Sequence, residues 1–151
     1  MSPSAAIPDK AQVPIVVAVI KNDAGQLLIA RRNDPSLSDA HDKWELVGGR
    51  LEWAESPEQA IIREVKEEAG LDVEVVRLLP KIYPNFWKKS DGSEYKVLLI
   101  AYECKVIGGQ LHASEFDPKI AELKFIPRAD VDKYEFLPLD PEIINLAYAG
   151  H

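Results

Sequence analysis

Three glutamates, Glu64, Glu67 and Glu68, stand close together near the middle of the chain. In a helix of about 3.6 residues per turn, this spacing places the three carboxylates within one sector about 100° wide. Carboxylate oxygens are the ligands that Mg²⁺ and Mn²⁺ prefer, and a carboxylate can also accept a proton from water. A solvated acidic helix face is the competing explanation, because the string E-x-x-E-E is common in helices. The three acids alone do not decide between the two.

The segment that carries these acids has clear helix boundary signals. Ser56 is suited to cap the helix, Pro57 to occupy its first position, and Gln59 to complete a capping box, while Gly70 stands just past the end. The signals predict a helix over residues 57–69. Its core-facing side is expected to carry four apolar residues next to the acids, namely Ile61, Ile62, Val65 and Ala69.

The acids also belong to a longer pattern, GRLEWAESPEQAIIREVKEEAGL, which resembles the Nudix box. The family signature is G-x5-E-x7-R-E-U-x-E-E-x-G-U, where U is aliphatic. A chance match has a probability on the order of 10⁻⁷ with ordinary residue frequencies. Most of residues 13–147 is similar in layout to MutT-type nucleoside triphosphate pyrophosphohydrolases. Every specified position of the signature is met, at Gly49, Glu55, Arg63, Glu64, Val65, Glu67, Glu68, Gly70 and Leu71.

The resemblance implies a metal site and a reaction. Glu64, Glu67 and Glu68, with the carbonyl of Gly49, are expected to bind Mg²⁺ or Mn²⁺. The implied reaction is the attack of water on the diphosphate linkage of a nucleoside diphosphate derivative. Glu67 is our choice for the general base, with Glu64 as the alternative. Crowding of the carboxylates is expected to raise the proton affinity of at least one.

Arg63 and Glu55 are expected to support the box rather than to react. A guanidinium can hold a carboxylate through two parallel hydrogen bonds, which would fix the loop after Gly49 against the helix. The family resemblance implies the same supporting role.

Further candidates concern the substrate. Arg32 and Asp140 occupy positions where MutT-type relatives place base-contacting groups, and an ionised Asp140 would suit a guanine-type edge that carries N–H donors. Helix capping is the alternative role for Asp140. Glu115 and Asp117 correspond to an additional acid that many relatives bring to the metals, although an ordinary loop position explains both equally well.

Aromatic residues form one more candidate group. Tyr83, Phe86 and Trp87 stand in a segment rich in lysine, YPNFWKKSDGSE, which we interpret as a loop. Aromatic rings can stack on a base and lysines can attract phosphate. An ordinary cluster of loop residues is the alternative.

The elements around the box predict an α/β fold, specifically the Nudix-type α/β/α sandwich with a mixed β-sheet. A hairpin is expected from two apolar runs separated by Asn-Asp-Ala-Gly, and a polar loop is expected before WELVGG. Two short helices are expected to close the chain, the second starting at Asp140-Pro141. The expected strands lie at 15–20, 26–30, 44–49, 73–79, 95–106 and 122–127, and the loops at 33–43 and 83–94.

Composition and charge narrow the class of protein. The chain has 151 residues, with 18 Lys plus Arg and 25 Asp plus Glu, so its net charge is −7. We expect a flexible lead-in over residues 1–12 and one domain over residues 13–151. The acidic balance argues against a nucleic-acid polymer as partner, and no apolar run reaches the roughly 20 residues of a membrane span. A cytoplasmic monomer or homodimer that acts on a small nucleotide is therefore expected.

Several functions stay open at this point. The favoured one is hydrolysis of a (d)NTP or an oxidised dNTP to the monophosphate and pyrophosphate. An ADP-ribose or dinucleoside polyphosphate pyrophosphatase is the alternative, although residues 86–89 lack the Pro or Tyr that those groups tend to carry. A non-catalytic nucleotide-binding regulator is a second alternative, but the box retains every acid. RNA decapping would need a basic groove or extension.

Overall fold

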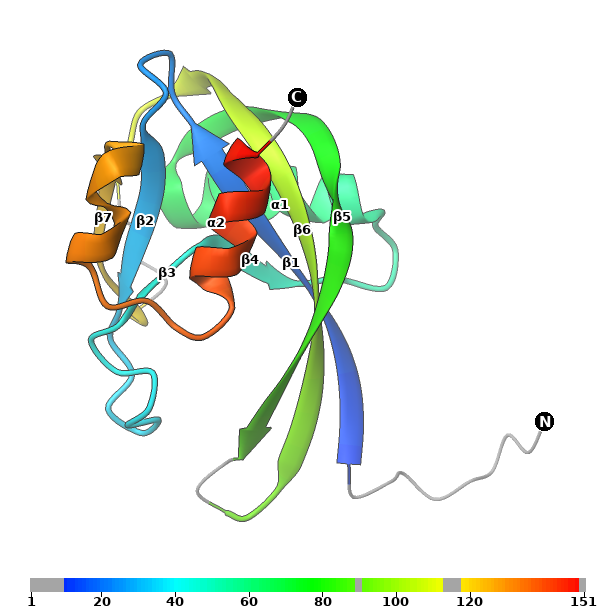
Figure 1. Ribbon diagram of the computed structural model, residues 1–151. Coiled ribbons are helices and arrows are strands. Elements are labelled where there is room, and N and C mark those ends of the chain that lie inside the picture. Colours follow the sequence, from blue (N-terminus) through cyan, green and yellow to red (C-terminus); the bar gives the residue numbers. More distant parts are fainter. Residues whose placement is uncertain (1–9, 89–90, 113–117, 150–151) are drawn as a thin grey trace.

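The computed structural model describes residues 10–88, 91–112 and 118–149 (Figure 1). A seven-stranded mixed sheet forms the centre in the order β3-β2-β1-β6-β5, while β4 pairs with β1 and β7 pairs with β2. The elements are β1 (Lys10–Lys21), β2 (Leu27–Arg32), β3 (Trp44–Glu45), β4 (Val47–Arg50), α1 (Pro57–Ala69), β5 (Leu71–Lys88), β6 (Glu94–Gly109), β7 (Ile120–Ile126), the 3₁₀ helix η1 (Arg128–Lys133) and α2 (Asp140–Tyr148).

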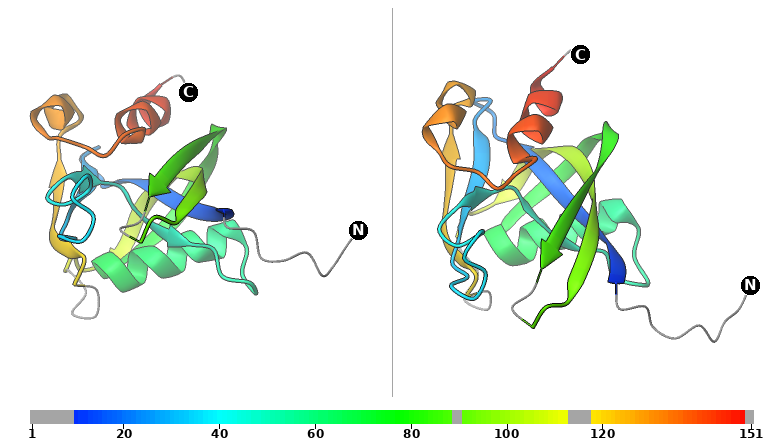
Figure 2. Two further views of the ribbon diagram at one scale, coloured as in Figure 1. Left: turned by 90° about the horizontal axis from the view of Figure 1, so that it is seen from below. Right: turned by 60° about the horizontal axis from the view of Figure 1, so that its bottom comes forward.

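Strand β1 lies at the centre and is buried on both faces. Val17 and Val19 belong to one apolar core, whereas Val16, Ala18 and Ile20 belong to a second core on the opposite face. Successive side chains of a strand point to opposite faces, so one β-branched run supplies both cores. Helix α1 covers one face, and η1 with α2 covers the other (Figure 2). The predicted α/β/α sandwich with a mixed sheet is confirmed.

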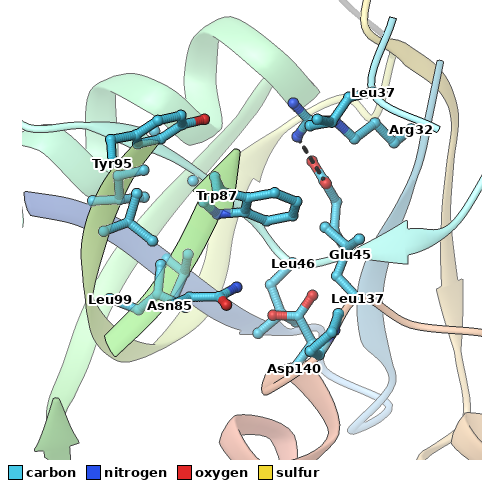
Figure 3. A pocket seen from close by; sticks show the side chains of 16 residues that line it. Arg32, Leu37, Glu45, Leu46, Asn85, Trp87, Tyr95, Leu99, Leu137 and Asp140 are labelled. Atoms are coloured by element: carbon cyan, nitrogen blue, oxygen red, sulfur yellow. Dashed lines mark hydrogen bonds and ion pairs between the residues drawn. The ribbon is translucent and has the colours of Figure 1, made fainter. Parts of the chain in front are cut away.

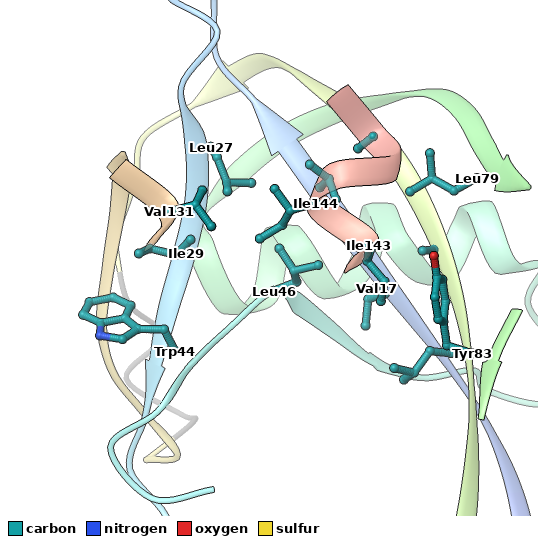
Figure 4. Close-up of a cluster of buried hydrophobic side chains, with 14 of the residues drawn as sticks. Val17, Leu27, Ile29, Trp44, Leu46, Leu79, Tyr83, Val131, Ile143 and Ile144 are labelled. Carbon is teal, nitrogen blue, oxygen red and sulfur yellow. The ribbon is translucent and has the colours of Figure 1, made fainter. Parts of the chain in front are cut away.

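The core under α2 contains an aromatic residue that the sequence placed in a loop. Tyr83 is 1% exposed and packs in this core near Ile143 of α2 and Val17 of β1 (Figure 4). Its hydrophobic ring is therefore part of the interior. The interpretation of Tyr83 as a base-stacking loop residue is wrong.

Strands β5 and β6 form a long antiparallel hairpin that extends below the body of the molecule (Figure 1). Residues 83–88 belong to β5, where Tyr83 pairs with Leu99 and Trp87 pairs with Tyr95. The prediction of a loop there was wrong. Pro84 favoured a loop in the sequence, but β5 is the last strand in the sheet order, where a proline is tolerated.

Other expectations hold with small changes. The hairpin between β1 and β2 is antiparallel, with Lys21 opposite Leu27, although most of β2 pairs with β7. Strand β1 begins at Lys10, three residues before the expected start of the fold, because it pairs with β6 from there. Ile62 is 45% exposed, so it is not a core residue of α1.

No helix in the described segments combines the length and apolar character needed to cross a membrane.

Candidate active site

Helix α1 begins and ends where the sequence predicts. The Ser56 hydroxyl accepts a hydrogen bond from the Gln59 backbone N–H at 3.2 Å, and the Gln59 side chain accepts one from the Ser56 N–H at 2.8 Å. Gly70 ends the helix in a left-handed conformation with φ of 75°, which glycine adopts without strain. These local interactions fix the start and end of the acidic helix.

Arg63 joins the helix to the loop that precedes it. Its Nε and Nη2 donate to the two carboxylate oxygens of Glu55 at 2.9 and 2.6 Å, and Nη2 also donates to the Arg50 carbonyl at 3.3 Å. The Arg63 hydrogen bonds lower the pKa of Glu55 to about 2, which keeps this carboxylate ionised. The bidentate support predicted for Arg63 and Glu55 is present in the structure.

The same guanidinium reaches two of the three acids. Arg63 Nη1 donates to Glu64 Oε1 at 2.9 Å and to Glu67 Oε2 at 3.2 Å, and Glu68 forms a side-chain hydrogen bond with Glu64. Burial raises the pKa of Glu64, and the charge of Glu67 adds to this effect, while Arg63 opposes it. The expected rise in proton affinity is therefore found, but burial contributes more to it than repulsion does.

Gly49 lies directly beside the Glu64 carboxylate. A Cβ atom on Gly49 would stand 2.5 and 2.6 Å from the two Glu64 oxygens, closer than any real contact allows. Strand β4 brings Gly49 there because it pairs with β1, where Gly49 is opposite Val16. The missing side chain thus leaves room beside a half-buried carboxylate.

The oxygen donors around Glu64 fit a hard divalent cation. Glu64, Glu67 and Glu68 offer carboxylates on α1, and Gly49 lies against the Glu64 carboxylate without a side chain in the way. Within the part of the chain that the structure describes, no three acidic, histidine or cysteine side chains are gathered into a ready cation site. Glu67 has a 60% exposed side chain, so it can leave Arg63 without disturbing the core.

A pocket of about 180 Å³ is lined by Gly48 and Gly49 of β4 and by Asp140 at the start of α2, among others. Figure 3 shows how Arg32, Glu45, Trp87 and Asp140 lie around it. Apolar residues from β1, β6 and the segment before α2 form much of its wall. Its polar and aromatic lining consists of Arg32, Glu45, Asn85, Trp87, Tyr95 and Asp140. This arrangement combines rings that can stack with groups that can form hydrogen bonds.

Arg32 and Glu45 face each other in this pocket. Arg32 Nη1 donates to Glu45 Oε2 at 3.1 Å (Figure 3). Arg32 Nη2 donates to Asp34 Oδ2 at 3.3 Å. Burial would lower the pKa of Arg32, but Glu45 and Asp34 outweigh this effect and the pKa rises. The structure therefore places Arg32 in the pocket as a charged group that two carboxylates hold.

Asp140 is buried where the start of α2 meets the pocket. Burial and the charge of Glu45 raise its pKa well above the ordinary value, although its carboxylate accepts a hydrogen bond from the Leu46 backbone N–H. The expectation that Asp140 caps α2 is wrong, because Leu139 holds the cap position and no side chain caps this helix end. Asp140 instead points toward the pocket (Figure 3).

The remaining candidates divide by position. Trp87 lines the pocket, whereas Phe86 is 75% exposed and lies outside it. Neighbouring residues of a strand point to opposite faces, which separates the Phe86 ring from the face of β5 that carries Asn85 and Trp87. Glu115 and Asp117 lie outside the described residues.

Three polar or aromatic pocket residues, Glu45, Asn85 and Tyr95, were missed in the sequence. Glu45 lies between the buried residues Trp44 and Leu46 and is opposite Ala30 of β2, from where its side chain reaches Arg32. Asn85 stands two residues before Trp87 on the same face of β5. The strand alternation around Glu45 was visible in WELVGG, whereas Asn85 could be found only once residues 83–88 were assigned to a strand.

A family model described as NUDIX domain matches residues 11–146, which is most of the chain. The chain belongs to the NUDIX domain family. The site described above therefore contains the family's box, and the resemblance predicted from the sequence is confirmed.

Curated relatives of this Nudix chain align with its central part. The 8-oxo-dGTP diphosphatase of Escherichia coli (strain K12) is 36% identical over 77 residues, or 50% of this chain and 57% of the relative. The 8-oxo-dGTP diphosphatase of Proteus vulgaris is 40% identical over 78 residues, or 52% and 68%. The ADP-ribose pyrophosphatase of Methanocaldococcus jannaschii is 37% identical over 107 residues, or 71% and 58%. The chain thus aligns with only about half to two thirds of each relative.

Solved structures share the fold of this Nudix chain. A NUDIX hydrolase from Nitrosomonas europaea superposes with a TM-score of 0.71 and 25% identity, covering 91% of this chain and 89% of the other. The MutT protein from Methanosarcina mazei Go1 superposes with a TM-score of 0.69 and 23% identity, covering 92% and 94%.

Proposed function

We propose that this chain is a metal-dependent Nudix pyrophosphohydrolase that converts a (d)NTP or an oxidised dNTP to the monophosphate and pyrophosphate. One observation supports this proposal above the others. Gly49 stands against the Glu64 carboxylate of the acidic helix and also lines the pocket that contains Trp87. A nucleotide whose base occupies the pocket would therefore extend its phosphates toward the box glutamates.

The box residues would divide the chemistry among themselves. Glu64, Glu67, Glu68 and the Gly49 carbonyl would hold Mg²⁺ or Mn²⁺. The bound cation would neutralise phosphate oxygens and thereby make phosphorus open to attack by water. Glu67 would accept the proton of that water at a carboxylate oxygen, with Glu64 as the alternative base. Arg63 would keep both acids on the side of the helix that faces the Gly49 strand.

The pocket would recognise the base. Trp87 offers a ring for stacking, and the Glu45 carboxylate accepts hydrogen bonds only. The raised pKa of Asp140 favours its protonated form, which donates one hydrogen bond and accepts another. A guanine-type edge has adjacent N–H donors beside a carbonyl oxygen and therefore matches this set. The assignment of Asp140 as an ionised acceptor is replaced by Glu45 in that role.

ADP-ribose is the second candidate substrate. The ADP-ribose pyrophosphatase of M. jannaschii aligns with 71% of this chain, compared with 50% for the E. coli 8-oxo-dGTP diphosphatase. Both candidates contain the diphosphate linkage that the box would cleave. They differ in the group on the far side of that linkage.

A product-resolved substrate panel tests the proposal. The purified chain would be incubated with Mg²⁺ and, separately, dGTP, 8-oxo-dGTP, the other dNTPs, ADP-ribose and dinucleoside polyphosphates, and the products separated by chromatography. The proposal expects release of a monophosphate and pyrophosphate from a guanine nucleotide, and no product when EDTA is present. Faster turnover of ADP-ribose would support the second candidate, and binding without any turnover would support a regulator.

A further inference from the structure

Asp34 is a buried carboxylate to which the proposed reaction gives no part. It follows β2 at the start of the loop 33–43 and is 8% exposed. Its Oδ1 accepts a hydrogen bond from the Ser36 hydroxyl at 2.6 Å, and its Oδ2 accepts one from Arg32 Nη2 at 3.3 Å. The Ser36 hydroxyl, with the help of Arg32, lowers the pKa of Asp34. An ionised group at this depth is costly unless it is paired, and here both oxygens are paired.

The backbone of Asp34 organises the loop that begins with it. Its N–H donates to His41 Nδ1 at 3.0 Å, and its carbonyl accepts from the Leu37 N–H at 3.0 Å. The first bond ties the start of the loop to its end, and the second forms a turn. Within this loop, Leu37 lines the pocket that also contains Arg32 and Trp87. The turn at Asp34 therefore sets where that part of the pocket wall stands.

The side chain of Asp34 also fixes the charged side of the pocket. Asp34 and Glu45 hold the Arg32 guanidinium at its two terminal nitrogens, 3.3 and 3.1 Å away. A planar guanidinium held at two points has one orientation. Asp34 thus supplies one of the two contacts that orient the guanidinium toward the Glu45 carboxylate.

We propose that Asp34 is a positioning residue for nucleotide binding, which holds the Arg32–Glu45 pair and Leu37 in the pocket wall before the nucleotide arrives. The inference rests on the proposed function. A wall that is already ordered does not have to be ordered by the ligand, so affinity is higher. Since Asp34 acts at the base end of the pocket, its removal weakens binding and leaves the chemical step at the box unchanged.

Steady-state kinetics with dGTP and Mg²⁺ test the functional part. Asp34→Ala is expected to raise KM about tenfold while kcat stays within about twofold of the parent. The KM of Asp34→Asn is expected to lie between those of the parent and Asp34→Ala. The amide oxygen still accepts a hydrogen bond from Ser36 but carries no charge for Arg32. Asp39→Ala, at an exposed position of the same loop, is the control and leaves both constants unchanged. An unchanged KM in Asp34→Ala, or the same rise in KM in Asp39→Ala, overturns the proposal.

Amide hydrogen exchange tests the structural part without any turnover. Asp34→Ala is expected to speed exchange in residues 33–43 at least tenfold while β1 and β6 stay protected, and Asp39→Ala is expected to change neither. Unchanged exchange in the loop of Asp34→Ala contradicts the positioning role. If the parent chain does not hydrolyse dGTP, the proposed substrate has failed, and the exchange result still decides whether Asp34 orders the pocket wall.

Discussion

Gly48 and Gly49 are neighbours in β4, yet each lacks a side chain for a different reason. A Cβ on Gly48 would stand 2.9 Å from the backbone Cα of Val17, which cannot move aside. A Cβ on Gly49 would collide with the carboxylate of Glu64, which is the end of a flexible side chain. The first glycine serves the fold, and the second serves the proposed cation site.

Alanine substitutions at these two positions are expected to separate fold from function. Gly48→Ala should lower the melting temperature by several degrees, because forcing an atom against backbone costs about 1–3 kcal/mol. Gly49→Ala should keep most of the parent's stability but lose most of the stabilisation that millimolar Mg²⁺ gives the parent, because the displaced Glu64 binds the cation less well. Thermal unfolding with and without Mg²⁺ measures both effects. Equal behaviour of the two variants would show that Gly49 has no special link to the metal.

Two carboxyl groups of the pocket are expected to differ in how they read a base. Glu45→Gln should change the ratio of kcat/KM between dGTP and dATP by about tenfold, equivalent to roughly 1.4 kcal/mol, because an ionised acceptor becomes an amide. Asp140→Asn should leave that ratio within about threefold, since a protonated carboxyl and an amide each donate and accept. A tenfold change in Asp140→Asn with an unchanged melting temperature would show that Asp140 acts in its ionised form.

The box residues could be predicted from the sequence because their partners are close in the chain. Arg63 and Glu55 are eight residues apart, and a helix and one tight loop bring them together. Glu45 was missed because its partner Arg32 comes from another strand across the loop 33–43, and Asn85 was missed because residues 83–88 were assigned to a loop. Burial of Asp140 was equally out of reach, since it depends on how α2 packs on the sheet.

Helix α2 is attached to the strands by hydrogen bonds from a buried charged cluster and by one exposed ion pair. Glu103 is 6% exposed and lies between Lys21 at 3.4 Å and Arg77 at 3.0 Å. Lys21 and Arg77 also donate to backbone carbonyls near the end of α2, where cations are favourable. Lys81 and Glu142 form the second attachment at 2.8 Å, with both side chains about half exposed.

The buried attachment of α2 is expected to matter more than the exposed one. Glu103→Ala should cost about 3–5 kcal/mol of unfolding free energy, because it leaves two cations without their buried partner. Glu142→Ala, the matched control, should cost less than about 1 kcal/mol, since water screens exposed pairs. Urea unfolding of the two variants gives both values. A small loss in Glu103→Ala would show that the hydrogen bonds to α2 suffice without the carboxylate.

Elements with local signals were predictable, and those that depend on a distant partner were not. The capping box and the C-terminal glycine define α1 within fifteen residues. Strand β5 gave no such signal beyond Leu79, because Pro84 and the lysines resemble a loop until β6 pairs with them. Its lower half is what brings Asn85 and Trp87 to the pocket, so the error in the element hid part of the site.

The whole molecule consists of two apolar cores that share one sheet. Cys104 belongs to the core under α1, is fully buried, and has a pKa raised to about 12 by that burial. A disulfide reagent at neutral pH is expected to label this thiol only when the chain unfolds globally, so the labelling rate should equal the unfolding rate measured by tryptophan fluorescence. Labelling at least tenfold faster than unfolding would show that the layer with α1 opens separately.

Pyrophosphate release measures most directly whether the box carboxylates catalyse hydrolysis of a nucleotide diphosphate linkage. Release of pyrophosphate from dGTP at saturating Mg²⁺ should be compared in the parent, in Glu67→Gln, and in Glu58→Gln as a control on the same helix. We expect kcat to fall at least about 100-fold in Glu67→Gln with little change in melting temperature, while Glu58→Gln resembles the parent. Activity of Glu67→Gln within about threefold of the parent would contradict this expectation.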